Sequence, residues 1–217
     1  STMRVRRRWI GALAAVLMAS AVLAAALNRD QALAGLSHKE AAARLAAVDR
    51  LAEIGSMADA SLVIERLADA DPRVRISAEA ALWQIWGRSG DPAIDTLYAR
   101  GVAQMHAAAL DDALATFNDI VRRKPAFAEG WNKRATIYFL RGENERSLRD
   151  CDEVFKRNPD HFGALAGAGQ IHLLRGDLHR ALEFFRRAVK VNPNLAGPAQ
   201  MIPLLERKLQ DDEKNRT

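Results

Sequence analysis

Three prolines at one constant interval constrain the fold of this chain more than any other feature of its sequence. They are Pro125, Pro159 and Pro193. The same pattern of small and apolar residues recurs around each of them, so the chain divides into three units that each end two residues after a proline. The units are Ile94–Phe127, Ala128–His161 and Phe162–Leu195. A period of about 34 residues is typical of a helix-turn-helix repeat.

Within each unit, the small and apolar positions predict two helices that cross closely. Positions 8 and 20 are always small, as required where a Cβ branch would hold two helices apart. Positions 21, 24 and 27 lie three residues apart and are apolar, which is the spacing of one buried helical face. Position 8 holds Gly101, Ala135 and Gly169, position 20 holds Ala113, Ser147 and Ala181, and position 24 holds Phe117, Cys151 and Phe185.

Position 15 predicts the turn between the two helices of a unit. Gly142 and Gly176 stand there in the second and third units, and glycine permits the backbone that a tight turn needs. Ala108 departs from this pattern in the first unit. The prolines end the second helices, because proline lacks the donor that would continue a helix.

These positions resemble the tetratricopeptide repeat family. The middle unit carries the fullest signature, and the outer units have Leu97 and Leu165 in place of its tryptophan. The matching residues are Trp131, Ala135, Tyr138, Gly142, Val154 and Pro159. The resemblance implies an all-α fold, a right-handed α-solenoid of three tetratricopeptide units over residues 94–209.

The residues after the third unit predict a capping helix over 199–209, which would cover the last apolar face of the array. Its apolar residues are helically spaced and are Met201, Ile202, Leu204, Leu205 and Leu209. Because Pro203 would stand inside a long helix, a start between Ala199 and Pro203 is expected. Residues 210–217 are polar and are expected to form a frayed tail.

The segment over residues 37–90 is helical in composition but follows a different repeat. Residues 44–55 resemble residues 75–86, and Asp71-Pro72-Arg73-Val74-Arg75 is a strong helix start. This opening and the later Ala-x-x-Ala-Leu run resemble HEAT repeats. A plain helical hairpin that caps the first tetratricopeptide unit is the alternative, and both interpretations predict stacked antiparallel helices.

Residues 1–34 have the order of parts of a secretory signal. Four arginines within residues 4–8 precede an uncharged apolar stretch from Trp9 to Leu27, and Ala32-Leu33-Ala34 offers a signal-peptidase site. Cleavage after Ala34 would leave Gly35 first. The stretch is also near the length that crosses a bilayer, so an uncleaved membrane anchor is the alternative.

Charge gives no case for a nucleic-acid partner. The chain has a net charge of +5, with 32 basic and 27 acidic residues. Five of the arginines and one aspartate lie within residues 1–34, so the rest of the chain is balanced to within one charge. The basicity therefore belongs to the leader, and phosphate binding is not expected.

No motif for catalysis, metal or cofactor binding is recognised. The histidines form no i, i+4 pair and are His38, His106, His161, His172 and His179. The glycine run over residues 163–169 lacks the Lys-Ser/Thr of a phosphate loop. Cys151 replaces a phenylalanine of the other units, so we expect a buried structural thiol. The sequence predicts no enzyme activity and no cofactor.

The family resemblance also implies where a ligand would bind. In tetratricopeptide repeats, positions 2, 5, 9 and 12 of the first helices line a concave groove. Here they are Asp95, Tyr98, Val102 and Met105; Glu129, Asn132, Thr136 and Phe139; and Gly163, Ala166, Gln170 and Leu173. Some family members clamp a C-terminal carboxylate with Lys, Asn and Arg at positions 5 and 9. Only Asn132 fits that pattern, so such a clamp is not expected.

A closer resemblance covers residues 80–195. The run from Phe127 to Thr136 and the later His161–Leu165 resemble a family of small exported tetratricopeptide proteins of Gram-negative bacteria, as do Trp83, Trp86 and residues 89–92. This resemblance implies a location and a fold, and it adds no activity.

Together these observations predict a non-enzymatic protein-interaction adaptor or scaffold, exported to the periplasm, that binds a peptide or protein segment in its groove. The alternative is an inner-membrane-anchored, periplasm-facing subunit that assembles or stabilises a larger envelope complex. The sequence names no partner.

Overall fold

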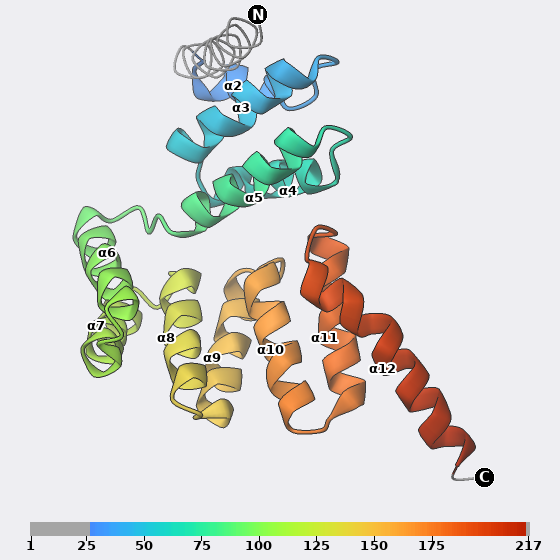
Figure 1. Ribbon diagram of the computed structural model, residues 1–217. Coiled ribbons are helices and arrows are strands. Elements are labelled where there is room, and N and C mark those ends of the chain that lie inside the picture. Colours follow the sequence, from blue (N-terminus) through green and yellow to red (C-terminus); the bar gives the residue numbers. More distant parts are fainter. Residues whose placement is uncertain (1–26, 216–217) are drawn as a thin grey trace, which may run out of the picture. The chain divides into compact units, whose positions relative to one another are not determined.

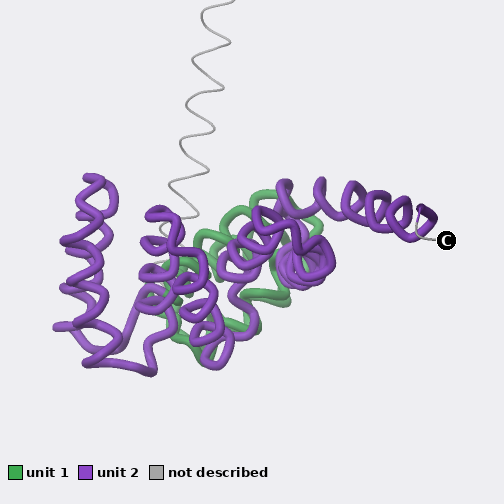
Figure 2. The backbone as a smooth tube through the Cα atoms, turned by 90° about the horizontal axis from the view of Figure 1, so that it is seen from below, with its two compact units in different colours: residues 1–86 green, residues 87–217 purple. Residues whose placement is uncertain are grey.

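Every regular element is helical in the part of the chain that the structure, a computed structural model, describes, residues 27–215 (Figure 1). These residues form two compact units, which divide between Trp86 and Gly87 (Figure 2). We call them the N-terminal unit and the C-terminal unit. The predicted all-α class is confirmed.

The C-terminal unit repeats its helix boundaries with the predicted period. The first helices of the three repeats are α6 (Pro92–His106), α8 (Ala128–Leu140) and α10 (Phe162–Leu174). The second helices are α7 (Leu110–Arg123), α9 (Asn144–Arg157) and α11 (Leu178–Val191). Each first helix packs on the second helix of its own repeat. The expected solenoid of helix-turn-helix units is confirmed.

All three turns share one backbone conformation, including the turn that lacks glycine. Gly142 and Gly176 both have φ of 76°, and Ala108 has φ of 56°. In each turn the next residue donates to the carbonyl five residues earlier, for example Ala109 N–H to Gln104 O at 2.9 Å. The helices on either side therefore impose the turn on Ala108, although the left-handed region costs a non-glycine residue about 1–2 kcal/mol.

In the first and third repeats, an aromatic ring lies directly on a glycine. A Cβ atom at Gly101 would lie 2.6 Å from the Phe117 ring, and one at Gly169 would lie 2.7 Å from the Phe185 ring. Both rings are almost wholly buried. The glycines of position 8 are thus required by the rings of position 24, and each pair joins the two helices of its repeat.

Trp131 marks the junction of the first and second repeats. Its indole Nε1 donates to the Pro125 carbonyl at 2.9 Å, and the guanidinium groups of Arg134 and Arg157 each lie 4.9 Å from its ring centroid. Arg134 also forms a bidentate pair with Asp150, at 2.7 and 2.8 Å. The tryptophan that carries the family signature therefore has a structural role between two repeats.

The helix after the third repeat, α12 (Ala196–Lys214), is longer than the predicted cap at both ends. It follows the start of α10 by the same interval that separates the starts of α8 and α10, so it continues the register of the first helices. The prediction of a start at or after Ala199 was wrong, because Pro198 falls in the first turn, where its missing N–H has no helical partner to lose. Pro203 stands inside the helix. Residues 210–214 are helical and are not a frayed tail.

The N-terminal unit consists of α2 (Arg29–Gly35), α3 (Ala41–Ile54), α4 (Ala60–Glu65) and α5 (Pro72–Trp86), with short 3-10 turns η1 (Met57–Asp59) and η2 (Arg66–Ala68). Its core combines alanines with larger aliphatic side chains. The fully buried residues include Ala46, Ala47, Leu51, Ala78, Ala81 and Leu82, and α3 packs against α5. The HEAT assignment of this unit stays a prediction.

Two buried aspartates link the helices of the N-terminal unit. Asp69 forms a bidentate pair with Arg44, with both N–O distances at 2.8 Å, and its carboxylate side chain is 2% exposed. Asp59 is equally buried and pairs with Arg29. These bonds join α3 to the loop before α5, and α2 to η1.

The predicted leader overlaps this unit. Residues 27–34 are described, and α2 within them has a capping box at Asn28 and a fully buried Ala32. The segment boundary predicted at residue 37 is therefore wrong, because α2 folds against α3 as part of the N-terminal unit. Of the apolar stretch from Trp9 to Leu27, residues 9–26 lie outside the described part of the chain. No helix within residues 27–215 has the length and apolar character to cross a membrane.

Candidate ligand groove on the first helices

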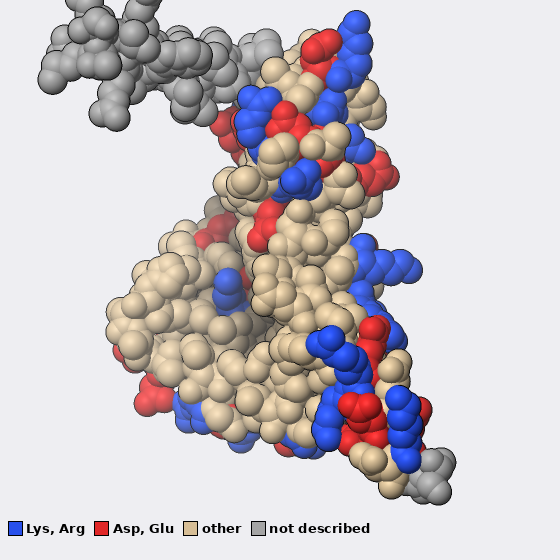
Figure 3. Space-filling model, turned by 45° about the vertical axis from the view of Figure 1, so that its right-hand side comes forward, with Lys and Arg blue, Asp and Glu red and all other residues tan. Residues whose placement is uncertain are grey.

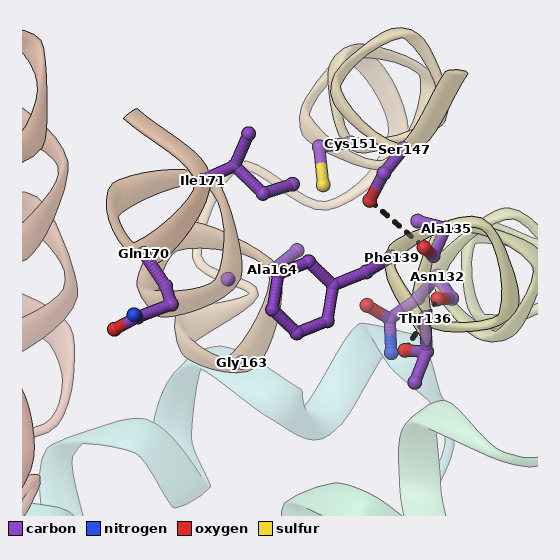
Figure 4. Close-up of a pocket in the computed structure, with 11 residues that line it drawn as sticks. Asn132, Ala135, Thr136, Phe139, Ser147, Cys151, Gly163, Ala164, Gln170 and Ile171 are labelled. Carbon is purple, nitrogen blue, oxygen red and sulfur yellow. Dashed lines mark hydrogen bonds between the residues drawn. The ribbon is translucent and has the colours of Figure 1, made fainter. Parts of the chain in front are cut away.

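Five of the predicted groove residues line one cavity between α8 and α10. Its volume is about 210 Å³ (Figure 4). Asn132, Thr136 and Phe139 reach it from α8, and Gly163 and Gln170 reach it from α10. Gln170 is exposed, whereas Asn132 is buried. The register therefore brought these residues together correctly.

The floor of the cavity consists of residues that the groove positions do not include. They are Ala135, Ser147, Cys151, Ala164, Gly167 and Ile171. Ser147 Oγ donates to the Ala135 carbonyl at 2.8 Å, so its hydroxyl is used within the repeat. The signal that could have found them is Cys151 itself, which is smaller than the residue the other repeats have at its position.

Cys151 is buried, as expected, and its thiol has no nucleophilic character. Burial raises its pKa to about 12, and the carboxylates of Asp150 and Asp152 add to the rise. Because only a thiolate is a good nucleophile, a thiol with this pKa stays protonated and inert near neutral pH. Cys151 shapes the cavity and does no chemistry in it.

Glu129, a predicted groove acid, lies inside the protein and not on its surface. Its carboxylate is 1% exposed and accepts a bond from His161 Nε2 at 2.7 Å and from Asn132 Nδ2 at 3.1 Å. Lys133 lies 3.3 Å away. Burial alone would raise the pKa of Glu129, but His161, Lys133 and Asn132 outweigh it and hold that pKa below its ordinary value.

The second nitrogen of His161 fixes the orientation of this network. His161 Nδ1 accepts the Ala164 N–H at 3.1 Å, in the first turn of α10. The ring proton therefore lies on Nε2, from which it is donated to Glu129. The imidazole thus links α8 to the start of α10, and this bond holds the two walls of the cavity at a fixed separation.

The other predicted groove residues serve mainly in packing. Tyr98 contacts the rings of Phe117 and Phe127 edge-on, and burial raises the pKa of its hydroxyl. Asp95 accepts bonds from the backbone and side chain of Ser89. The remaining members pack against the buried clusters of their repeats and are Val102, Met105, Ala166 and Leu173.

Two leucines that do not line the cavity are exposed near the ends of α8 and α10. Leu140 is 57% exposed and Leu174 is 61% exposed, and they stand at equivalent positions of the second and third repeats, next to Phe139 and Leu173. The groove positions carried over from the family do not include them. In the view of Figure 3, charges of both signs gather at the α12 end, whereas much of that face is uncharged.

All of the residues that line the cavity are uncharged. In the described part of the chain, no group of three or more His, Cys, Asp or Glu side chains could hold a metal ion. What the cavity does offer is apolar surface, with an amide at its mouth.

Comparison with known proteins agrees with the repeat register. A model of the family described as "Tetratricopeptide repeat" matches residues 132–196. A TPR repeat-containing protein of Rhizobium etli is 29% identical over 67% of this chain and 71% of its own length. DnaJ homolog subfamily C member 3 of Homo sapiens is 29% identical over 43% of this chain. The matched segment spans only 19% of that protein.

Solved structures show the same fold. The first TPR domain of Spaghetti (RPAP3), bound to the HSP90 peptide SRMEEVD, superposes with a TM-score of 0.51 at 17% identity over 54% of this chain and 93% of its own. The Sgt2 TPR domain from Aspergillus fumigatus has the same TM-score at 21% identity, over 58% of this chain and 84% of its own. Helix boundaries, turns and relatives agree: residues 132–196 match the tetratricopeptide repeat model, and the C-terminal unit has the fold of TPR domains.

Proposed function

We propose that this protein is a non-enzymatic adaptor that binds a peptide or protein segment along the groove of its first helices. The observation that carries the proposal is the uncharged cavity between α8 and α10, which opens beside the exposed Gln170. Concave, mostly apolar sites with a few polar groups are the usual form of a binding site. The bond from His161 to Glu129 joins α8 to the start of α10, so less ordering free energy is lost on binding.

The chemistry of the groove favours apolar contacts over recognition of a terminal carboxylate. A solved domain with the same fold holds the HSP90 peptide SRMEEVD. In this chain the single residue that fits a carboxylate clamp is Asn132, and its side-chain amide already donates to Glu129 at 3.1 Å. An uncharged groove without a clamp suits a segment with apolar anchors, such as one face of an amphipathic helix.

The adaptor proposal is tested by charging the mouth of the cavity. The full chain is panned against a displayed library of random peptides, and binding of the enriched peptides is then measured to the variant Gln170→Arg. The exposed Gln170 tolerates a longer side chain, so we expect an intact fold and at least tenfold weaker binding. The matched control, Ala115→Arg, adds the same charge at an exposed position of α7. Failure to enrich any peptide, or equal binding by both variants, contradicts the proposal.

We also propose that the protein is exported and cleaved ahead of α2. The leader in residues 1–26 supports export, and α2 supports a change in the expected cleavage site, because a cut after Ala34 would remove Arg29 from the buried Asp59. Ala24-Ala25-Ala26 supplies the small residues of a site just before α2. Intact mass of the protein from the cell envelope checks this. A chain starting at Leu27 is expected, a start at Gly35 contradicts it, and an uncleaved chain favours the membrane-anchored alternative.

A further inference from the structure

The middle repeat lacks the aromatic ring that fills the other two. Positions 8 and 24 hold glycine and phenylalanine in the first and third repeats, and each ring lies against its glycine. In the second repeat the same positions hold Ala135 and Cys151. The alanine methyl group and the thiol occupy far less volume than a phenyl ring, so this repeat is underfilled where its neighbours are full.

The space left by the missing ring opens into the groove. Ala135 and Cys151 both line the cavity whose other walls are the groove residues Thr136, Phe139 and Gln170. Figure 4 shows the Cys151 sulfur directed into the space between α8 and α10 that the Phe139 ring enters. We call this cavity the Cys151 pocket. It connects the interior of the middle repeat to the surface on which a ligand would lie.

Below Gln170 at the mouth, the hydroxyl groups and the Asn132 amide of the pocket already donate hydrogen bonds within the protein. Ser147 Oγ donates to the Ala135 carbonyl at 2.8 Å, and Thr136 Oγ1 donates to the Asn132 carbonyl at 3.0 Å. The Asn132 amide donates to Glu129. A polar occupant would therefore lose its hydrogen bonds to water and gain few hydrogen bonds in the pocket, which costs free energy. An apolar occupant gains roughly 25 cal/mol for each Å² of surface removed from water.

The volume sets the size of that occupant. A cavity of about 150 Å³ lined by apolar side chains holds a benzene ring. The Cys151 pocket, at about 210 Å³, accommodates one aromatic or large aliphatic side chain and not two. In the flanking repeats a phenyl ring already lies at the equivalent place, so the helix spacing of this fold accepts such a group.

We propose that the Cys151 pocket receives a single aromatic or large aliphatic side chain from a bound peptide segment. The partner then supplies the ring that the middle repeat lacks, and Gln170 at the mouth bonds to the peptide backbone beside it. This inference rests on the proposed adaptor function and names the main anchor of the ligand. Anchors of this kind, held in a pocket near the centre of an interface, carry most of the binding energy in many complexes.

The test transplants the pair of the flanking repeats into the middle one. The probe is the set of peptides enriched by panning a displayed random library against the full chain. The double variant Ala135→Gly/Cys151→Phe places a ring on a glycine, as in the first and third repeats, and should fold with a melting temperature no lower than that of the parent. We expect it to bind the enriched peptides at least tenfold more weakly. Cys151→Ala, which leaves the pocket open, should retain their binding.

A second variant and a second readout cover a failure of the double variant to fold. Cys151→Leu fills part of the pocket with a flexible side chain and should weaken binding in the same direction. Replacement of each peptide residue by alanine should identify one aromatic or large aliphatic position whose loss costs at least tenfold in affinity. Peptides without such a position overturn the inference.

The outcomes separate this inference from the adaptor proposal. If the filled variants bind as tightly as the parent while Gln170→Arg does not, the groove binds peptides without the pocket and only this inference fails. If no peptide is enriched, the adaptor proposal fails as well. A photo-crosslinking residue at position 170 that joins to residues 1–26 of the same chain would make the leader the occupant, and that result also overturns the inference.

Discussion

The two units of this protein differ in the contacts that hold their helices together. In the first and third repeats of the C-terminal unit, bulky rings lie on glycines, so shape fixes the distance between the paired helices. In the N-terminal unit, alanines let the helices approach closely, and buried aspartates bonded to arginines fix their positions. Removal of one partner from such a pair leaves a buried charge without its counterion, so we expect the N-terminal unit to depend on these contacts.

The same difference explains why the two units were not equally readable from sequence. The ring and its glycine have the same separation along the chain in the first and third repeats, so the pair recurs with the period and can be recognised. Arg44 and Asp69 are 25 residues apart and Arg29 and Asp59 are 30 apart. Neither pair recurs, and no local pattern marks either partner as buried.

The largest effect is expected from removing a buried aspartate of the N-terminal unit. Asp69→Ala leaves the Arg44 guanidinium without its bidentate partner, and breaking a buried pair in this way costs about 3 kcal/mol of unfolding free energy. Hydrogen exchange of the α3 and α5 amides measures the loss. Glu65→Ala, which removes an exposed carboxylate beside Arg66, is the control and should change little. A similar effect of both variants would mean that the charged contacts do not hold this unit.

The next largest effect is expected at a glycine of the C-terminal unit. Gly169→Ala places a methyl group 2.7 Å from the Phe185 ring, and overpacking of this kind costs about 2 kcal/mol. Gly167→Ala, on the same helix, meets nothing within 4 Å and should instead stabilise α10 by about 0.5–1 kcal/mol through helix propensity. Thermal unfolding of both variants decides this. Melting temperatures that move in the same direction would show that contact with the Phe185 ring is not the reason for the glycine at position 8.

Acid should weaken the Asp69 and Asp59 contacts of the N-terminal unit before the uncharged ring contacts of the C-terminal one. Bonds from Arg44 lower the pKa of Asp69, and the bonds of Asp59 to Arg29 and Ser56 outweigh its burial and lower its pKa too. Because both pKa values are lower in the folded than in the unfolded state, this stabilisation is complete above the unfolded value of about 3.9 and is lost as pH falls below it.

Hydrogen exchange at a series of pH values between neutral and strongly acidic checks this order. The α3 and α5 amides should lose protection at a higher pH than those of α11, which packs on α10 through the uncharged Gly169–Phe185 contact. The variant Asp69→Asn should reduce the pH dependence of α3. If both units lose protection at the same pH, the proposed difference between charged contacts in one and ring contacts in the other is contradicted.

The smallest effect is expected at the turn that lacks glycine. Ala108→Gly removes an alanine with left-handed backbone conformation and should stabilise the first repeat by about 1 kcal/mol. The release of backbone strain exceeds the free energy lost because glycine gives the unfolded chain more conformational freedom. Ala107→Gly, one residue earlier at φ of −80°, should be destabilising instead. The pair is compared by urea denaturation. A loss of stability in Ala108→Gly would contradict the strain inferred from its backbone.

The sequence predicted the repeats and part of the site, and its failures have physical causes. The repeat period placed Thr136, Phe139 and Gln170 correctly, because side-chain direction follows from position in a helix. It could not show that Glu129 turns inward, because the partner that draws it there, His161, lies at the far end of the same repeat, where the chain enters α10. It also gave no sign that α12 would begin before Ala199 and extend beyond Leu209.

Trp131 has a practical consequence for all of these experiments. Its indole is held by the Pro125 carbonyl of the preceding repeat and lies between two guanidinium groups. Separation of the first and second repeats would break that bond and expose the indole N–H to water, while both cations, which belong to the second repeat, would stay beside the ring. The protein therefore contains an intrinsic optical probe at one defined seam, and once its signal is isolated by replacing the other tryptophans, its emission can be followed without any added label.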